Sequence, residues 1–302
     1  MVELWIPITI VAAFMQNARS ALQKHLKDRL STLGATYVRF LYALPFAILY
    51  VAALDVIGGK QLPEPNRLFF LYALLGGVAQ IVFTALLMWL FSFRNFAVGT
   101  TFSKTEVVQV AILGLLILGD TLTPLAAIAV GVAAAGVMIL SAGQTNVSAA
   151  SLITSLAEKP TLIGLASGAF LGASVVFFRG AALSLGHDGV VMAAAFTLAV
   201  ALIIQTAIMG IYLAWKEPAT LRAVVVHWRW SLAVGIAGVL ASVCWFTAFT
   251  LQNGAYVRAL GQIELIFTFF ASVFFFRERT SRTEVLGILL VAVGIIILVL
   301  AR

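Results

Sequence analysis

The chain has 302 residues, of which 62% are hydrophobic and only 10% are charged, and its mean hydropathy is +1.08. Soluble domains have about 45–50% apolar and about 25% charged residues, so this composition excludes a soluble globular protein and predicts a polytopic membrane protein. The formal net charge of +7 would suggest nucleic-acid binding in a soluble chain. Here the basic residues stand mostly at the ends of apolar runs, where membrane insertion favours them, so we expect no nucleic-acid partner.

Ten apolar segments approach the roughly 20 residues that a helix needs to cross a ~30 Å hydrocarbon core. In chain order they are residues 4–24, 34–54, 68–91, 96–118, 124–140, 162–183, 189–213, 231–251, 255–276 and 284–300. The first segment has no basic leader and no small-residue cleavage site after it, so we expect a retained span. Uninterrupted apolar runs lack the alternation of a membrane barrel, and the expected fold class is an all-α membrane protein with ten transmembrane helices.

The two halves of the chain resemble one another when the sequence is shifted by 158 residues. The shift superposes Gly77 on Gly235, Phe91 on Phe249, Asn95 on Asn253, Ala97 on Ala255, Glu106 on Glu264, Asp120 on Glu278, Gly136 on Gly294 and Leu140 on Leu298, without a gap. We therefore divide the chain into a first five-helix repeat (1–142), a linker (143–159) and a second five-helix repeat (160–302). Because five is odd, the second repeat must enter the membrane from the opposite face, which predicts an inverted-topology repeat.

Two glutamates stand deep inside apolar segments, one in each repeat. Glu106 and Glu264 lie about ten residues into the fourth and ninth segments, roughly 15 Å along a helix axis at 1.5 Å per residue. A charged side chain at this depth is costly and is usually retained for a function. Desolvation favours the uncharged form of a carboxyl group, so either residue can take up a proton or hold a substrate ammonium group. The alternative is a structural carboxylate that is hydrogen-bonded between helices.

Lys104 stands two residues before Glu106, and residues at this spacing do not face each other on a helix. We therefore expect Lys104 to pair with Glu264 across the repeats, as a gate or as a fixed scaffold. Pairing with Glu106 is the alternative.

The ninth segment carries a further polar run formed by Tyr256, Arg258 and Gln262. Arg258 lies only about one turn inside the segment, so it either contacts substrate or extends to the membrane interface. Arg19, Arg39 and Arg179 lie within a turn or two of segment ends, and the same two interpretations apply to them.

Uncharged polar and aromatic residues complete the candidate site. Gln16, Asn17 and Gln80 lie inside the first and third segments, where they either form interhelical hydrogen bonds or line a pocket. Trp89 and Trp245 are near matched positions of the third and eighth segments and could form the wall of a cavity. Small residues at a spacing of four, such as Gly164 to Gly168 and Gly131 to Ala135, predict helix packing.

An acid ends the fourth and ninth segments, at Asp120 in 118–122 and at Glu278 in 276–280, and a glycine-containing segment follows each. With ten helices in two repeats, this pattern resembles the drug/metabolite transporter superfamily, EamA branch, over essentially the whole chain. The resemblance implies that helices 1 to 4 and 6 to 9 surround a central cavity. It also implies that helices 5 and 10 pack at the periphery, where they could support a homodimer. Many members have a helix-breaking or small residue where this chain has residues 104–106 and 262–264.

The resemblance implies a secondary transporter that moves a small polar or zwitterionic, amino-acid-like metabolite by alternating access. Its partners would be the small-molecule substrate, the lipid bilayer and, as a candidate coupling ion, the proton. A flippase for a lipid carrier or phospholipid is the alternative, because a positively lined cavity can hold a phosphate head group. The candidate substrate- or proton-binding residues are Glu106, Glu264, Lys104, Gln262, Arg258, Tyr256, Trp89, Trp245, Gln16, Asn17 and Gln80.

An integral-membrane enzyme that acts on lipid is a third alternative. Cys244 is the only cysteine, and His25, His187 and His227 all flank apolar segments. The sequence has no spacing typical of a metal site or of a nucleophile and its base, so we expect no cofactor, no metal and no catalytic residue.

The expected location is the bacterial inner membrane. Most basic loop residues follow odd-numbered segments, which predicts both termini outside the cytoplasm. The resemblance to the family implies instead that both termini are inside, so the sequence leaves the orientation and the direction of transport open.

Overall fold

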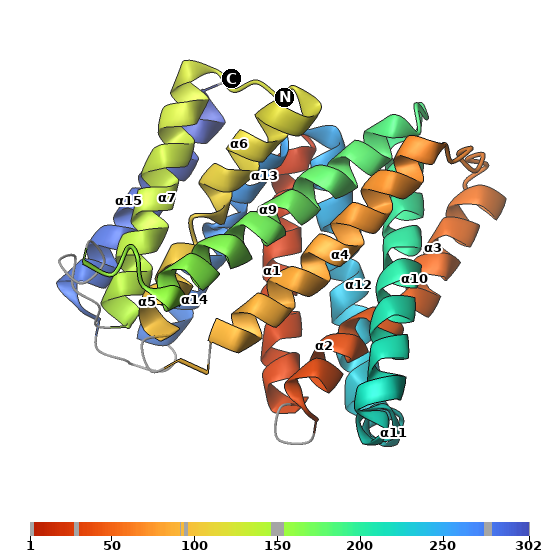
Figure 1. Cartoon of the computed structure of the whole chain (residues 1–302). Coiled ribbons are helices and arrows are strands. Elements are labelled where there is room, and N and C mark those ends of the chain that lie inside the picture. Colours follow the sequence, from red (N-terminus) through yellow and green to blue (C-terminus); the bar gives the residue numbers. More distant parts are fainter. Residues whose placement is uncertain are drawn as a thin grey trace. The chain divides into compact units, whose positions relative to one another are not determined.

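A computed structural model describes residues 3–26, 30–90, 92–93, 96–145, 154–274 and 280–301, and within these ranges every regular element is a helix (Figure 1). The helices are α1 (Trp5–Leu26), α2 (Thr32–Leu41), α3 (Leu44–Val56), α4 (Arg67–Leu90), α5 (Phe96–Ser103), α6 (Glu106–Leu118), α7 (Pro124–Gln144), α9 (Lys159–Ser184), α10 (Val190–Lys216), α11 (Pro218–Val226), α12 (Trp228–Leu251), α13 (Gly254–Gly261), α14 (Ile263–Phe274) and α15 (Arg282–Leu300).

Within the described residues, eight helical segments are long and apolar enough to cross a membrane. They correspond to eight of the ten expected segments, and the expected number of ten is not confirmed. The first segment (4–24) is missing from the eight, because Gln16, Asn17 and Arg19 lower the hydropathy of α1. The ninth segment (255–276) is also missing, and its last two residues lie outside the described part.

Contacts divide the chain into two compact units. Unit 1 contains Met1–Val78 and Phe177–Leu251, and unit 2 contains Ala79–Val176 and Gln252–Arg302. Each unit therefore combines segments from both halves of the sequence, so the division into units differs from the division into repeats.

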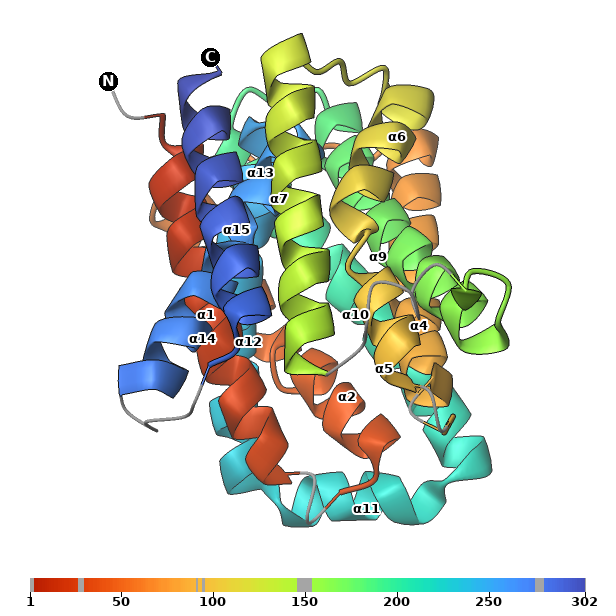
Figure 2. The same ribbon diagram turned by 90° about the vertical axis from the view of Figure 1, so that its left-hand side faces the viewer.

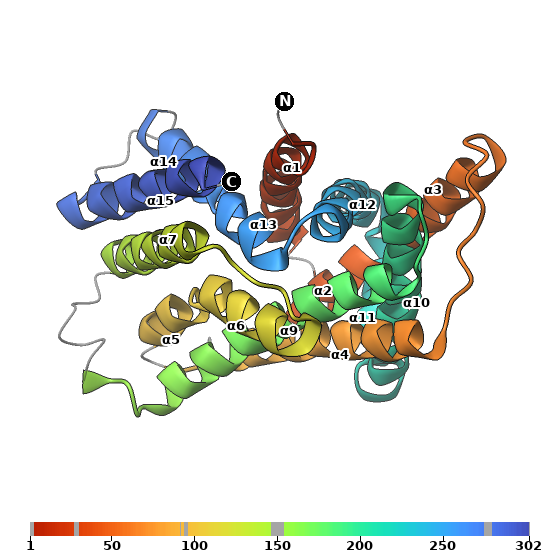
Figure 3. The same ribbon diagram turned by 90° about the horizontal axis from the view of Figure 1, so that it is seen from above.

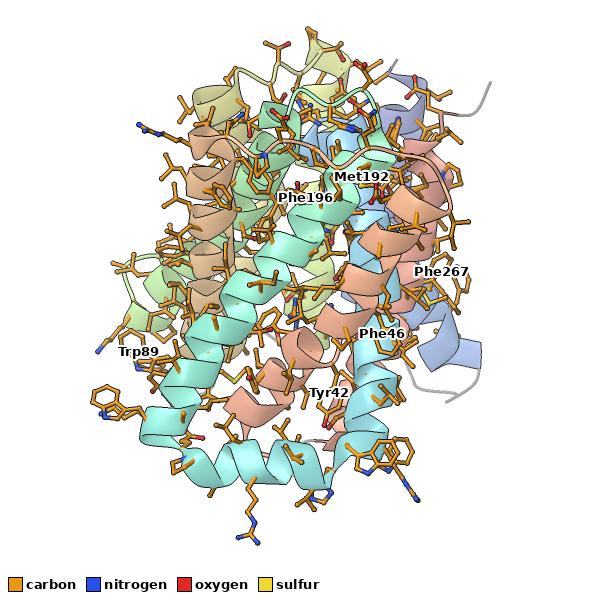
Figure 4. The ribbon with its side chains drawn as sticks, turned by 90° about the vertical axis from the view of Figure 1, so that its right-hand side faces the viewer. Tyr42, Phe46, Trp89, Met192, Phe196 and Phe267 are labelled. Carbon is orange, nitrogen blue, oxygen red and sulfur yellow. The ribbon has the colours of Figure 1, made fainter. Side chains whose placement is uncertain are left out.

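In unit 1, α1 packs along α12, and α10 packs against α3 and α12 (Figure 3). The short helix α11 crosses the ends of α10 and α12 (Figure 4), and Tyr42 donates a hydrogen bond of 3.1 Å from its hydroxyl to the Val224 carbonyl of α11. Helix α2 approaches α12 very closely at Gly235, where an added Cβ would lie 2.5 Å from Tyr42 Cβ. These contacts fix α1, α2 and α12 as one packed group.

In unit 2, α7 and α15 lie side by side and run antiparallel (Figures 1 and 2). Thr123 is the N-cap of α7, and its Oγ1 lies 3.4 Å from the Ala301 carbonyl oxygen at the end of α15. At the other end of α7, Gly143 lies against Glu284 in the first turn of α15. The two helices approach through backbone atoms, as small residues allow in membranes.

The contacts between these helices obey the repeat shift. An added Cβ at Gly136 would lie 2.6 Å from Val291 N, and one at Gly294 would lie 2.7 Å from Ala133 N. Adding 158 to 136 and 133 gives 294 and 291, so each contact becomes the other when the two helices are exchanged. This segment of the structure therefore has a local two-fold relation between its α7 and α15 halves.

A matched pair of glycines on α7 tests this packing. We expect Gly136→Ala to lower the free energy of unfolding by about 1–3 kcal/mol, because the new methyl group meets backbone atoms that cannot move independently. Gly131 has no atom within 4 Å of an added Cβ, so Gly131→Ala should leave stability unchanged or raise it by about 0.5–1 kcal/mol through helix propensity. Equal stabilities of the two variants in detergent unfolding titrations would contradict the close contact.

The glycines Gly164, Gly168 and Gly172 of α9 form a second small-residue contact in unit 2. A Cβ at Gly164 would collide with the Gly99 carbonyl of α5, one at Gly168 would lie 2.8 Å from the Ser103 carbonyl oxygen, and one at Gly172 would lie 3.3 Å from Val110 N of α6. The prediction that the spacing from Gly164 to Gly168 serves helix packing is confirmed. The same prediction was wrong for Gly131, which faces open space.

Candidate functional site

The fourth and ninth apolar segments are each broken at the same place in the repeat. Residues 104 and 105 separate α5 from α6, and Gln262 separates α13 from α14. At both breaks the backbone hydrogen bonds span three residues, from Lys104 N to Thr101 O (3.1 Å) and from Gln262 N to Ala259 O (3.2 Å). Lys104 and Gln262 differ by 158, the repeat shift. A tight turn of this kind within a helix often indicates a hinge or a functional position.

Each break places a glutamate in the first turn of a new helix. Glu106 is the first residue of α6, and Glu264 is the second residue of α14. The unpaired amides at a helix N-terminus carry a partial positive charge that stabilises a carboxylate. The sequence predicted both glutamates in the middle of straight helices, where no unpaired amides would stabilise their carboxylates.

Arg258 of α13 forms an ion pair with Glu106 of α6, from Nη2 to Oε1. The pair joins a helix of the first repeat to a helix of the second, and it is buried, with Glu106 only 5% exposed. The sequence had predicted a different pair across the repeats, between Lys104 and Glu264, with pairing of Lys104 and Glu106 as the alternative. Lys104 lies half-buried in the break, and among the residues that the structure describes no carboxylate lies within 4 Å of its ammonium group.

Arg258 does not extend to the membrane interface because the start of α13 is itself buried. Asn253 caps this helix by accepting a hydrogen bond of 2.9 Å from Ala255 N, and it is 8% exposed. Gly254 packs against Val110 and Val175. The Arg258 guanidinium is therefore held away from solvent, and the Glu106 carboxylate is its counter-ion.

The charge of Glu264 also acts on Arg258. Gln262 is 3% exposed and donates from Nε2 to the Arg258 carbonyl at 3.3 Å. Glu106, Arg258, Gln262 and Glu264, which we call the carboxylate cluster, thus contain two acids and one base. With all three ionised, the formal charge of the cluster is −2 + 1 = −1.

Two buried acceptor atoms of α6 lack hydrogen-bond partners within the described part of the chain. They are Oε2 of Glu106 and Oε1 of Gln109, both buried on the first turn of α6. Gln109 donates its Nε2 to the Leu165 carbonyl at 3.2 Å, which fixes the amide. Sequence reasoning missed Gln109, although its spacing of three from Glu106 places both on one helix face. Unsatisfied buried acceptors are suited to a proton or a cationic donor.

The other predicted residues of unit 2 are Trp89 and Gln80 on α4 and Tyr256 on α13. Trp89 is 48% exposed on α4, and its ring lies under Lys159, with Nζ 5.2 Å from the ring centroid. Its expected position in a cavity wall stays a prediction. Gln80 of α4 and Tyr256 of α13 are half-buried.

Three predicted residues belong to unit 1. Trp245 of α12 is 6% exposed, donates from Nε1 to Gln16 Oε1 of α1 at 3.0 Å, and stacks on Phe249 with 5.5 Å between ring centroids. Asn17 follows Gln16 on α1 and is half-buried. The contact between Gln16 and Trp245 is one of the interhelical hydrogen bonds that the sequence allowed.

Eight apolar helical segments of membrane-spanning length within the described residues indicate an integral membrane protein. The EamA-like transporter family matches residues 3–142 and 158–300, and the chain belongs to this family. The resemblance inferred from the sequence, to the EamA branch of the drug/metabolite transporter superfamily, is thereby confirmed. The family is one of membrane transporters.

A crystal structure described only as "Crystal structure of protein" is similar to the chain with a TM-score of 0.69 and 14% sequence identity, over 98% of this chain and 97% of that one. At this identity the similarity shows the fold alone. No curated protein matches the sequence.

Proposed function

We propose that the protein is a secondary transporter that moves a small polar or zwitterionic metabolite by alternating access, with proton uptake at the carboxylate cluster. The observation that carries this proposal is the pair of helix breaks at equivalent positions, each followed by a glutamate two residues after the matched residues Lys104 and Gln262. Transporters bind substrates and coupling ions at such discontinuous helices, where helix termini lie inside the membrane.

The charge of the cluster supports a cationic ligand. A formal charge of −1 in a poorly solvated site is unfavourable, and one proton or one ammonium group cancels it. Oε2 of Glu106 and Oε1 of Gln109 offer acceptors for that donor. A proton and a substrate ammonium group that compete for the same acceptors would couple the movement of one to the movement of the other.

The geometry of unit 2 supports an inverted repeat of ten helices. The corresponding helices α7 and α15 run antiparallel, and their contacts exchange under the shift of 158. An inverted-topology repeat requires this direction reversal between equivalent helices. In this proposal α1 and the broken pair α13–α14 supply the two spans beyond the eight identified by hydropathy.

Transport by reconstituted protein tests the proposal. Full-length protein in proteoliposomes would be presented with radiolabelled amino acids and small amines, with and without a pH gradient. We expect at least one of these compounds to accumulate, and an enclosed pH-sensitive dye to report proton movement that depends on it. If neither compound class entered beyond the level of protein-free vesicles, the proposal would be wrong.

A further inference from the structure

Helix α11 lies across the ends of two membrane-spanning helices of unit 1 (Figure 4). Helix α10 runs for 27 residues and ends at Lys216, and α12 runs for 24 residues from Trp228. Both helices are long and apolar enough to cross a membrane. The 9 residues of α11 therefore lie at the depth of the lipid head groups, where the two spans leave the hydrocarbon core.

Packing covers one side of α11 and leaves the other side exposed. Val224 is buried, and Thr220 packs against the start of α2. Arg222, Val225 and Val226 are exposed, and the spacing of helical residues places them on the side opposite Thr220 and Val224. The exposed side of α11 therefore presents a cation next to two apolar side chains, as in helices that lie in a membrane interface.

Exposed basic and aromatic side chains also stand at the helix ends that α11 joins. Lys216 Nζ lies 4.0 Å from the ring centroid of Trp215, and Arg229 Cζ lies 5.6 Å from the ring centroid of Trp228. Tryptophan and basic residues of this kind are typical of the boundary between hydrocarbon and water. The exposed residues of this region, which we call the basic rim, are Trp215, Lys216, Arg222, Val225, Trp228 and Arg229.

The cations of the basic rim are not neutralised by the protein around them. Among the residues that the structure describes, no carboxylate lies within 4 Å of the charged groups of Lys216, Arg222 or Arg229. Glu217 follows Lys216, but it is half-buried and accepts a hydrogen bond of 2.9 Å from Thr220. The rim therefore has an excess of positive charge that faces outward.

The opposite end of α10 has the reverse balance of charge. There His187, two residues before the N-cap of α10, has its Nε2 2.9 Å from the Gln61 carbonyl oxygen, so the α3–α4 and α9–α10 connections meet at this end. The charged residues described in these two connections and in the adjoining helix turns are Asp55, Glu64, Asp188, Lys60 and Arg67. Acids outnumber bases in this set, so the excess of positive charge is specific to the α11 end of α10.

We propose that the basic rim binds the head groups of anionic phospholipids. Lysine and arginine attract the negatively charged surface of a leaflet, and guanidinium groups match the oxygens of a phosphate. The exposed tryptophan and valine side chains lie among the upper parts of the acyl chains, which a soluble anion does not have. A lipid therefore satisfies both the charge and the apolar surface of the rim, whereas a free phosphate satisfies the charge alone.

This surface goes beyond the proposed transport and does not depend on it. The basic rim belongs to unit 1, whereas Glu106, Arg258 and Glu264 belong to unit 2. Glu264→Gln should therefore bind anionic lipid as the wild-type protein does, even if that variant loses proton-coupled transport.

Quenching of tryptophan fluorescence by phospholipids with brominated acyl chains measures this binding. The purified full-length protein would be titrated in maltoside micelles with brominated phosphatidylglycerol, which is anionic, and with brominated phosphatidylcholine, which has no net charge. Trp215 is 76% exposed and Trp228 is 51% exposed, so both report lipid at the rim. We expect the wild-type protein to bind phosphatidylglycerol at least tenfold more tightly than phosphatidylcholine, and added salt to reduce this preference.

Two double variants with the same change in net charge locate the binding surface. One basic residue near an anionic surface contributes about fivefold to binding, so Arg222→Gln with Arg229→Gln should weaken the binding of phosphatidylglycerol at least tenfold. The same variant should bind phosphatidylcholine as the wild type does. Lys60→Gln with Arg67→Gln, at the opposite end of α10, is the matched control and should stay within about twofold of the wild type for both lipids.

Three results would overturn the proposal. The first is a wild-type protein that binds the two lipids equally, and the second is an equal loss of phosphatidylglycerol binding in the two double variants. The third is displacement of phosphatidylglycerol by an equal concentration of glycerol phosphate, the soluble head group without acyl chains, which would make the rim a site for a soluble anion. The comparison of lipids and salt uses the wild-type protein alone, so it decides the question even if a variant does not fold.

Discussion

Replacing Arg258 by methionine should destabilise the protein by about 3–5 kcal/mol, because the change leaves the carboxylate of Glu106 buried without its counter-ion. Methionine keeps the apolar length of the side chain, so the loss reports the charge and its hydrogen bond. Unfolding titrations in mixed detergent measure the effect. Arg222→Met, at an exposed position of α11, is the matched control and should stay within about 0.5 kcal/mol of the wild type.

A double variant separates the contribution of the ion pair to stability from the contribution of side-chain packing. Arg258→Met combined with Glu106→Gln removes both charges, and we expect it to recover more than half of the lost stability, since no uncompensated charge remains. Additive losses in the double variant would show that the two side chains contribute independently, and the ion pair would then not be the stabilising element.

Glu264→Gln should abolish accumulation driven by a pH gradient while it leaves the protein folded. The amide has almost the shape of the carboxyl group, and Arg258 keeps its ion pair with Glu106. The formal charge of the cluster becomes −1 + 1 = 0, so the cluster no longer needs a proton to become neutral. In the wild type, one pH unit corresponds to about 1.4 kcal/mol and supports about tenfold accumulation at one proton per substrate. In the variant the ratio should fall to one.

The measurement is the concentration ratio of labelled substrate across the proteoliposome membrane, with the internal dye as a record of proton movement. Glu64→Gln, at an exposed loop position of unit 1, is the control and should accumulate substrate as the wild type does. If Glu264→Gln still concentrated substrate along the pH gradient, Glu264 would have no part in coupling.

The class of protein, eight of the membrane spans and the matched glutamates could be predicted from the sequence because apolar length and repeat spacing are local signals. The breaks between α5 and α6 and between α13 and α14 could not be predicted from the sequence. Residues 104–105 contain neither glycine nor proline, and the turn there depends on how α5 and α6 pack against α9. The glutamates were therefore expected in the middle of straight helices rather than in the first turn of new ones.

The partner of the buried carboxylate could not be predicted either. Sequence spacing excludes Lys104 as an easy partner of Glu106, but it says nothing about which cation a neighbouring helix brings. Arg258 reaches Glu106 because the start of α13 packs against Val110 and Val175, and this is a tertiary contact. Its position near a segment end had left two interpretations open, contact with substrate or extension to the membrane interface. The side chain pairs with Glu106 because that end of the helix is buried.

The contact between Gly99 and Gly164 has a consequence for any comparison of this protein with its relatives. The two backbones are so close that a single methyl group at either position would force α5 and α9 apart. We therefore expect both glycines to be retained in relatives that share this contact, although neither has a side chain that can bind a substrate. Conservation alone will therefore not distinguish residues that bind substrate from glycines that allow two helices to pack closely.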